Sequence, residues 1–395
     1  IFNLSLSVMS ANKNSLTWVE ISAEALRENI RQFRKLLDGK ILCVCVKANA
    51  YGHGLVEASK IFLEAGADWL SVNSLYEARK LRENGVNSPI YILGYVPFCE
   101  LEEAVNLNTR IVVYNKETVL KLGEIGKPVK IHLKVETGNN RQGILTDEIA
   151  DFAKYAGKFP NIEIEGLSSH FANIEDTTDH SFSEKQLARF NDAIKKLGKE
   201  GIKIPIRHIA NSAAAILFPK THYEMVRIGI SAYGMWPSHE TYVSHLSSGD
   251  KFNLTPAFTW KTKIAQIKKV PAGEYVGYGC TYKVEHDTKL AILPVGYYDG
   301  YDRGVSNGYV LVCGKKAPIR GRICMNIIMV DVTAIPEAKL EDEVVLIGGG
   351  GRDGSSGGGS GGGETITAEQ FASWASTINY EITTRVNERI PRIMV

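Results

Sequence analysis

Short apolar runs alternate with amphipathic stretches from Trp18 to about Tyr233, at roughly one pair every 25 to 35 residues. The apolar runs predict buried strands, and stretches such as Leu55–Ala65 and Ser183–Leu197 have the period of helices. The eight predicted strands are 41–46, 69–72, 90–93, 111–113, 129–135, 162–167, 206–209 and 225–226. This alternation predicts an N-terminal (β/α)8 TIM-type barrel. An open doubly wound sheet would produce the same pattern and is the alternative.

The candidate catalytic and binding residues each lie at or just after the carboxyl end of a predicted strand. They are Lys47 after the first strand, Lys134 and Glu136 at the end of the fifth, His170 after the sixth, Asn211 and Ser212 after the seventh, and Arg227 and Gly229 after the eighth. In a parallel barrel these positions open onto one face, where barrel enzymes keep their active sites. This shared placement favours the barrel over the open sheet.

The pattern changes after about residue 250. Short alternating runs, punctuated by glycine and proline, predict strands at 258–264, 290–294, 309–312 and 327–332. Helical periods are scarce until Ala368, so a mostly β C-terminal domain is expected. Within it, Gly348–Gly363 contains eleven glycines and three serines, which predicts a flexible surface loop. A phosphate-binding loop would need a lysine and a following helix, which this segment lacks.

The expected domain boundaries follow from these changes. Residues 1–16 form an N-terminal extension that we expect to be disordered or non-native, with Met9 as a candidate native start. Residues 17–250 form the barrel, and residues 251–395 form the β-rich domain with its glycine-rich loop at 348–363.

Composition excludes several classes of protein. With 395 residues, 44% apolar and 23% charged, the chain is an ordinary soluble one, long enough for two domains. A net charge of +2 gives no field for nucleic acid or an acidic membrane. The six cysteines lack metal-ligand spacing, so we predict no metal and reduced thiols in a cytoplasmic protein. No apolar run reaches the roughly 18 to 20 residues that span a bilayer.

Lys47 is the first candidate for catalysis. It ends an apolar run and is followed by small residues, Tyr51 and two glycines. In a cleft its ammonium would lose solvation, which favours the free amine, a nucleophile able to form a Schiff base with an aldehyde. Tyr51 and the glycines suit close contact with a phosphate. Taken alone, a structural salt bridge remains the simpler interpretation of such a lysine.

Six motifs together resemble one family. They are Val-Lys-Ala-Asn-Ala-Tyr-Gly-His-Gly from Val46, His-Ile-Ala-Asn-Ser from His208, Val-Arg-Ile-Gly-Ile from Val226, Gly-Tyr-Gly from Gly277, Pro-Val-Gly-Tyr from Pro294 and Gly-Arg-Ile-Cys-Met from Gly321. In this order they resemble alanine racemase, a homodimeric pyridoxal 5'-phosphate enzyme with a barrel and a β domain. The resemblance covers nearly the whole chain from Trp18 onward.

The resemblance implies that the chain interconverts L-alanine and D-alanine through an external aldimine, supplying D-alanine for peptidoglycan. Racemisation needs an electron sink, supplied by the cofactor, and two bases on opposite faces of the α-carbon. The resemblance makes Lys47 one base and Tyr278 the other. Since Tyr278 is far in sequence from the barrel residues, active sites shared between subunits of a homodimer would explain it.

The resemblance also implies a set of cofactor-binding residues. His170 would hydrogen-bond Tyr278, although a core histidine is the alternative. Arg227 would face the pyridine nitrogen and, because arginine keeps its proton, leave that nitrogen mostly uncharged and suppress transamination. The phosphate would be held by Tyr51, by Ser212 and by the amides of Gly229 and Ile230. Asn211 and His208 would support them, and Asn211 with Ser212 could equally cap a helix.

Substrate contacts are implied at three residues. Arg141 would hold the carboxylate, the Met325 amide of the partner subunit would assist, and Tyr297 would line the pocket. Lys134 matches a lysine that is often carbamylated in the family, and a plain Lys134–Glu136 pair is the alternative.

Several residues depart from the family pattern. Asn139 and Asn140 replace a common Met-Gly, Asn326 a common aspartate, and Glu388 a common tyrosine. Glu388 would repel the phosphate unless Arg385 or Arg389 pairs with it. The preference for alanine over serine therefore stays open. The remaining alternatives are a broader serine racemase, a basic amino-acid decarboxylase and a non-catalytic carrier of pyridoxal phosphate.

Overall fold

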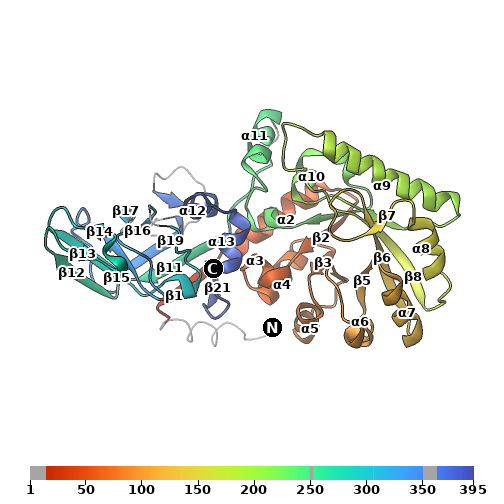
Figure 1. The fold of residues 1–395 in the computed structure, drawn as a ribbon, viewed down its shortest axis with the longest axis horizontal. Helices are drawn as coiled ribbons and strands as arrows, with labels where there is room; N and C mark the ends of the chain where they lie inside the picture. Colours follow the sequence, from red (N-terminus) through yellow and green to blue (C-terminus); the bar gives the residue numbers. More distant parts are fainter. Residues whose placement is uncertain (1–14, 250–251, 306, 350–362) are drawn as a thin grey trace. The chain divides into compact units, whose positions relative to one another are not determined.

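The fold is taken from a computed structural model of the chain, which describes residues 15–249, 252–305, 307–349 and 363–395. Its contacts divide the chain into two compact units (Figure 1). The barrel unit comprises residues 26–50 and 55–254, and the β-rich unit comprises residues 1–25, 51–54 and 255–395. Each unit is described in turn.

The barrel unit contains eight parallel strands, each within a few residues of its predicted position. They are β2 (Ile41–Cys45), β3 (Trp69–Val72), β4 (Ile90–Ile92), β5 (Thr109–Val113), β6 (Val129–Glu136), β8 (Ile162–Ser168), β9 (Ile206–His208) and β10 (Met225–Ile228). The sheet runs in the order β10-β2-β3-β4-β5-β6-β8-β9, with the short β7 (Ile144–Leu145) beside β6. The predicted (β/α)8 barrel is therefore confirmed, and the open sheet is excluded.

Backbone hydrogen bonds bring the two ends of this sheet together. The Glu224 amide donates to the Arg207 carbonyl at 3.3 Å, and the Arg227 amide donates to the Ala210 carbonyl at 3.2 Å. The segments of β9 and β10 are thus joined, which nearly closes the barrel. Since the strands are parallel, their carboxyl ends meet at one mouth.

Helices cover the outside of these strands (Figure 1). The helical segments along this part of the chain are α2 (Ala23–Leu36), α4 (Leu55–Glu64), α5 (Leu75–Glu83), α6 (Leu101–Asn106), α7 (Lys116–Ile125), α8 (Ile149–Ala156), α9 (Ser181–Lys199), α10 (Ser212–Leu217) and α11 (His239–Ser248), with 3-10 turns η1 (Phe98–Glu100), η2 (Pro219–Thr221) and η3 (Ile230–Tyr233). The short segment α3 (Lys47–Tyr51) has a left-handed backbone instead. The two helices expected from periodicity correspond to α4 and α9. Serine or asparagine caps α5, α7, α10 and α11, which fixes where these helices begin.

One side chain from each of six strands fills the barrel interior. The cluster consists of Cys43, Trp69, Tyr91, Val112, Ile206 and Met225. Residues at every second position of a strand face inward, so these side chains meet at one level of the barrel. This packed layer forms a floor beneath the carboxyl-end mouth.

The β-rich unit is built on a larger mixed sheet, a smaller antiparallel sheet and a hairpin. Its strands are β1 (Thr17–Ile21), β11 (Phe258–Lys263), β12 (Gln266–Val270), β13 (Tyr275–Val276), β14 (Tyr282–Lys283), β15 (Thr288–Leu293), β16 (Tyr309–Val312), β17 (Lys315–Pro318), β18 (Ile328–Asp331), β19 (Glu343–Gly349), β20 (Thr365–Ile366) and β21 (Arg392–Met394). The larger sheet runs β17-β16-β19-β11-β1-β21, β12-β15-β18 form the smaller sheet, and β13-β14 form the hairpin. The mostly β second domain is confirmed.

Two helices and two 3-10 turns complete this unit: α12 (Ala368–Ala375), α13 (Asn379–Arg385), η4 (Tyr278–Cys280) and η5 (Tyr297–Asp299).

A buried cation stabilises the centre of the larger sheet of the β-rich unit. The Lys261 ammonium lies 2.8 Å from carboxylate oxygens of both Glu20 and Glu343, which stand on the two neighbouring strands.

The contacts group two segments of the expected barrel, residues 17–25 and 51–54, with the β-rich unit. The strand β1 falls with the β-rich unit, because its backbone pairs with β11 and with β21. The expected boundary at residues 250 and 251 lies outside the described residues, as do residues 1–14 of the extension and 350–362 of the glycine-rich loop. All six cysteines are free thiols. In the part of the chain that is described, every helix is too short or too polar to cross a bilayer.

Candidate functional site

Lys47 follows β2 directly and opens a turn of unusual backbone conformation. Ala48, Asn49, Ala50 and Tyr51 all have φ between 52 and 54°, so they form a left-handed turn without a glycine. This conformation costs L-residues about 1–2 kcal/mol each, so neighbouring groups must hold it. Lys47 itself is half-buried.

Side-chain acceptors hold this turn. The Ala48 amide donates to Glu77 Oε1 at 2.7 Å, and the Leu55 amide donates to Asn49 Oδ1 at 2.9 Å. Glu77 also accepts from the Asn73 amide at 2.7 Å and completes the capping box of α5. One carboxylate therefore fixes both the start of α5 and the turn that carries Lys47.

Four cationic side chains gather with a histidine at the carboxyl ends of the strands. Burial, followed by the charges of Arg227, Lys134, Arg141 and Lys47, holds the pKa of His170 well below its usual value. His170 is therefore neutral near pH 7. The structure thus brings together five of the residues that the sequence singled out, from four different strands.

Lys134 lies among these cations and is itself largely buried. Burial, with the charges of Arg227, Arg141 and Lys47, lowers its pKa to about 7, and Glu136 opposes this shift. Lys134 and Arg141 line a pocket together with Val135, Glu136, Asn139, Gln142, Ser169 and His170. Glu136 Oε1 accepts a hydrogen bond from the Gly138 amide. A carboxylate that entered this pocket would meet cations of both lysine and arginine type.

Arg227 is buried, and its guanidinium is anchored on one side. It donates to Nδ1 of His208, and it donates to the Ser169 carbonyl at 2.8 Å. His208 is fully buried, and burial, with the charge of Arg227, holds its pKa well below the usual value. A neutral histidine therefore accepts from a charged arginine at the base of the site.

The loops after β9 and β10 are joined by a serine hydroxyl. Ser212 Oγ accepts from the Gly229 amide at 2.9 Å, so Ser212 lies beside the start of η3, which begins at Ile230. Asn211 caps α10 through its Oδ1, and its Nδ2 donates to Glu175 Oε1 at 2.7 Å. The helix-cap interpretation of Asn211 is thus confirmed, and Glu175 gives Asn211 a second, orienting contact.

Tyr51 belongs to the β-rich unit, where the C-terminal segment surrounds it. Its ring lies 6.1 Å from that of Tyr380. Gly52, at φ 86°, could not be replaced, because an added Cβ would stand 2.0 Å from the Thr383 carbonyl oxygen. The half-buried Arg392 donates to the Gly52 carbonyl at 2.9 Å. The position of Tyr51 is therefore fixed by residues more than 300 positions later in the chain.

Three further predicted residues lie exposed on the β-rich unit. Tyr278 is 72% exposed, Met325 54% and Tyr297 42%. The Tyr297 amide donates to the Cys324 carbonyl at 3.1 Å, and the Tyr298 amide donates to the Met325 carbonyl at 2.9 Å. The loops of Tyr297 and Met325 are thus held together. Large aromatic and thioether groups exposed on a surface are typical of a site that a partner covers.

Two of the departures from the family pattern, Asn326 and Glu388, have identifiable neighbours. Asn326 Nδ2 donates to Asp299 Oδ2 at 3.3 Å. Arg385 pairs with Asp302 and with Glu381, and Arg389 donates to the Tyr298 hydroxyl at 3.1 Å. The charge of Glu388 acts instead on Arg392, whose pKa burial lowers to about 10 and Glu388 raises in part.

Sequence reasoning missed three charged or titratable residues close to the site: Glu77, His132 and Glu165. The last two lie within predicted strands, and both are buried. The available signal was a histidine or glutamate inside an otherwise apolar strand, since such residues are buried only when they have partners.

Known protein families match both units. The family description "Alanine racemase, N-terminal domain" matches residues 21–237, and "Alanine racemase, C-terminal domain" matches residues 257–394. Alanine racemase of Halothermothrix orenii is 42% identical over 383 residues, covering 95% of this chain and 96% of its own length. That of Methanococcus maripaludis is 40% identical over 382 residues, covering 95% and 98%.

A solved structure agrees with these sequence matches. The crystal structure of alanine racemase from Bacillus anthracis with bound L-Ala-P superposes with a TM-score of 0.87 at 35% identity. The match covers 96% of this chain and 95% of that one. The resemblance seen in the motifs is thereby confirmed over almost the entire length, and the chain belongs to the alanine racemase family of isomerases.

Proposed function

We propose that the chain interconverts L-alanine and D-alanine with pyridoxal 5'-phosphate, by a two-base mechanism, as a cytoplasmic homodimer that supplies D-alanine for peptidoglycan. The observation that supports this most directly is the group of cations at the barrel mouth. Of the charges that act on Lys134, those of Arg227, Arg141 and Lys47 are positive and only that of Glu136 is negative. This excess of cations fits a ligand with a phosphate and a carboxylate.

The donor set fits the cofactor. Lys47 provides an amine for the aldehyde, and Arg227 provides a guanidinium, already anchored by His208 and Ser169, for the ring nitrogen. Ser212, the amides of Gly229 and Ile230, and Tyr51 are the residues that would hold the phosphate, with Asn211 behind Ser212. When bound, the cofactor supplies an electron sink for the carbanion formed at the α-carbon.

The residues of the chain would divide the remaining work. Lys47 would exchange a proton with one face of the α-carbon and Tyr278 with the other. His170, held neutral, is able to accept a hydrogen bond from a tyrosine hydroxyl and so make it a better base. Arg141 would hold the substrate carboxylate, assisted by the Met325 amide and Tyr297. The exposure of Tyr278 and Met325 in a single chain supports a homodimer with shared sites.

The direct test is to incubate the protein and cofactor with L-alanine or L-serine in deuterium oxide, followed by chiral analysis. We expect deuterium at the α-carbon together with racemisation of alanine, and a smaller rate on serine. Faster racemisation of serine would make the protein a broader amino-acid racemase. Bound cofactor without exchange on any amino acid would indicate a carrier, and carbon dioxide release from lysine or arginine a decarboxylase.

We further propose that Lys134 is carbamylated. A neutral amine adds to carbon dioxide, giving an N-carboxylate and one proton, and a pKa of about 7 leaves much of Lys134 neutral at neutral pH. The carbamate would place a negative charge beside Arg141 and Arg227, where the amine is neutral or positive. It would thereby orient Arg141 toward the substrate carboxylate.

Carbamylation should rise with pH. Below about pH 7 the Lys134 amine carries a proton and cannot react, whereas above it the free amine predominates. Carbon-13 NMR with labelled bicarbonate should therefore show a carbamate signal that grows from about pH 6 to about pH 8. The signal should disappear in Lys134→Gln and persist in Lys130→Gln. A lysine that shows no carbamate at any pH would favour the plain Lys134–Glu136 interpretation.

A further inference from the structure

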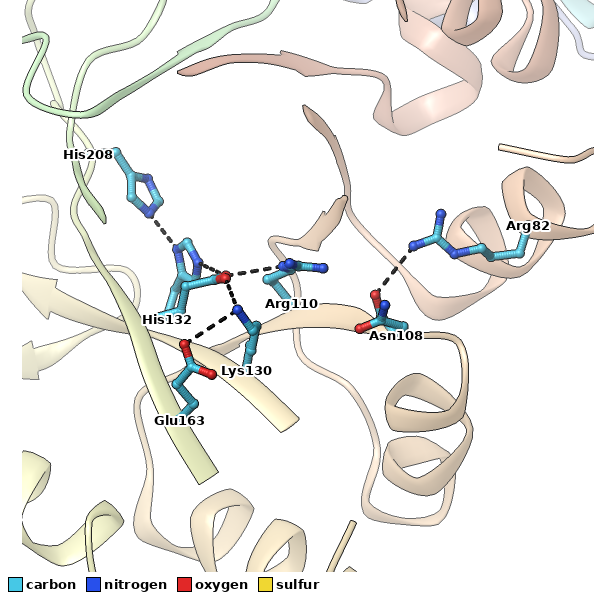
Figure 2. A network of polar contacts seen from close by, with 8 residues as sticks. Arg82, Asn108, Arg110, Lys130, His132, Glu163 and His208 are labelled. Atoms are coloured by element: carbon cyan, nitrogen blue, oxygen red, sulfur yellow. Dashed lines mark hydrogen bonds and ion pairs between the residues drawn. The ribbon is translucent and has the colours of Figure 1, made fainter. Parts of the chain in front are cut away.

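A row of buried polar groups leads from Arg227 away from the barrel mouth and ends at Glu165. His208 Nε2 lies 2.8 Å from His132 Nδ1 (Figure 2). His132 Nε2 lies 3.2 Å from Glu165 Oε2. Arg227 contacts the other nitrogen of His208. His132 and His208 are fully buried, and Glu165 is 5% exposed. The row thus runs inside the barrel unit, across β10, β9, β6 and β8.

The direction of every hydrogen bond in this row follows from its first member. Arginine can only donate, so His208 Nδ1 must accept and carry no proton. A neutral His208 then has its proton on Nε2 and donates it to His132 Nδ1. His132 in turn has its proton on Nε2 and donates it to the Glu165 carboxylate. Each group therefore has one role, and the order is Arg227 to His208 to His132 to Glu165.

The charges agree with this order. Burial lowers the pKa of both His132 and His208, so both rings are neutral near pH 7. Burial alone would raise the pKa of Glu165, but hydrogen bonds from His132, Lys130 and Arg110 lower it to about 2. Glu165 is thus an anion, and its carboxylate oxygens lie 2.8 Å from Lys130 Nζ and 3.1 Å from Arg110 Nε.

The barrel is shaped to hold His132 in this place. The pairing of β6 with β8 shifts register after Ile131, so that His132 stands opposite Gly166. A Cβ on Gly166 would lie 2.3 Å from His132 Nδ1, the atom that accepts from His208. The Tyr91 ring lies 4.7 Å from that of His132 and 5.5 Å from that of His208. The two imidazoles are therefore confined by strand geometry and by an aromatic neighbour.

We propose that Glu165 and His132 are positioning residues, which hold His208 in the Nε2–H tautomer and thereby fix the Arg227 guanidinium at the base of the site. The consequence for catalysis rests on the proposed function. A fixed arginine keeps a proton away from the cofactor ring nitrogen, which limits transamination. If Arg227 lost its acceptor, that nitrogen could take a proton from water, and the side reaction would increase. Besides stabilising the fold, this row of residues would therefore favour racemisation over transamination.

The first measurement uses the protein without cofactor. Nitrogen-15 NMR of histidine-labelled protein, assigned with His132→Gln and His208→Gln, should show one neutral tautomer for each ring, protonated on Nε2. A His208 ring protonated on Nδ1, or charged near pH 7, would overturn the proposal. Because this readout needs no substrate, it decides the question even if the protein racemises nothing.

The second measurement compares matched variants. Glu165→Gln removes the terminal charge, whereas Glu163→Gln makes the same change two residues away, at an exposed carboxylate 3.4 Å from Lys130. Gly166→Ala displaces His132, whereas Gly198→Ala adds a methyl group with no atom within 4 Å. We expect Glu165→Gln and Gly166→Ala to disturb the His208 tautomer, and the two controls to leave it unchanged. If Glu165→Gln does not fold, Gly166→Ala carries the test.

The third measurement links the row to the reaction. Each transamination converts one alanine to one pyruvate and leaves the amino nitrogen on the cofactor, so pyruvate per racemisation counts the side reaction. We expect this ratio to rise about tenfold in Glu165→Gln and Gly166→Ala and to stay at the wild-type value in the controls. A purely structural role would lower both rates together and leave the ratio constant, which would refute the proposal. Absence of wild-type racemisation would instead refute the proposed function.

Discussion

Lys47→Ala is expected to lower the racemisation rate by about 10⁴-fold or more, the largest loss of any single substitution in this chain. Lys47 has two proposed tasks, the covalent attachment of the cofactor and proton exchange on one face of the α-carbon. Alanine can do neither. Since Lys47 is half-buried at the end of β2, and neighbouring amides and side chains hold the turn that follows, the fold should survive the change. The loss should therefore be chemical.

Two readouts separate this loss from misfolding. Borohydride treatment followed by peptide mass spectrometry should attach the cofactor to Lys47 in the wild type and to no residue in Lys47→Ala. A small primary amine added to the variant should restore part of the exchange activity. Lys60→Ala, at an exposed position of α4, is the matched control and should behave as the wild type. Full activity in Lys47→Ala would instead support the alternative that Lys47 forms only a structural salt bridge.

Tyr278→Phe is expected to lower the racemisation rate by about 10²- to 10⁴-fold. Proton exchange should be lost on only one face of the substrate α-carbon. The change removes the phenolic oxygen proposed to take the α-proton of L-alanine and keeps the ring. In deuterium oxide, exchange from L-alanine should almost stop, whereas exchange from D-alanine, which depends on Lys47, should continue. Tyr275→Phe, at a 53% exposed tyrosine of the neighbouring hairpin, should retain both. Equal losses from both enantiomers would argue against two separate bases.

Co-expression of two inactive variants tests whether the two bases come from different subunits. When Lys47→Ala and Tyr278→Phe chains are co-expressed, each mixed dimer contains one site with an intact Lys47 and an intact Tyr278. Statistical assembly would then restore about a quarter of the wild-type activity. If both bases came from the same chain, no mixed dimer would contain an intact site, and activity would stay at the level of the variants.

The barrel was predictable because its signal is local. Each predicted strand is a short apolar run, and burial on both faces of a parallel sheet demands such runs whatever the rest of the chain does. The order of strands and helices then restricts the topology to a few choices. The carboxyl-end positions of Lys47, Lys134 and Arg227 followed from the same pattern, because a residue that ends a parallel strand must lie at one mouth.

The local sequence pattern did not predict contacts between residues that are far apart in the chain. Nothing near Tyr51 in the sequence indicates that Gly52 must be glycine, because the carbonyl that excludes a side chain belongs to Thr383. The membership of β1 in the β-rich unit was equally hidden, since an isolated strand pattern does not say with which strand it pairs. From the sequence alone, Glu77 would be taken for an ordinary helix-capping residue. Its contact with the turn after Lys47 is seen only in the folded structure.

The sequence by itself thus determined the architecture, the family and the identity of most candidate site residues, because apolar periodicity and contiguous motifs are properties of neighbouring positions. Only the tertiary structure decided the protonation and orientation of those residues. Whether Lys134 is neutral, and which nitrogen of His208 accepts, depends on the charges and donors that surround them. Arg227, His132 and Glu165 come from three different strands and Arg141 from the segment after β6, so they come together only in the folded barrel.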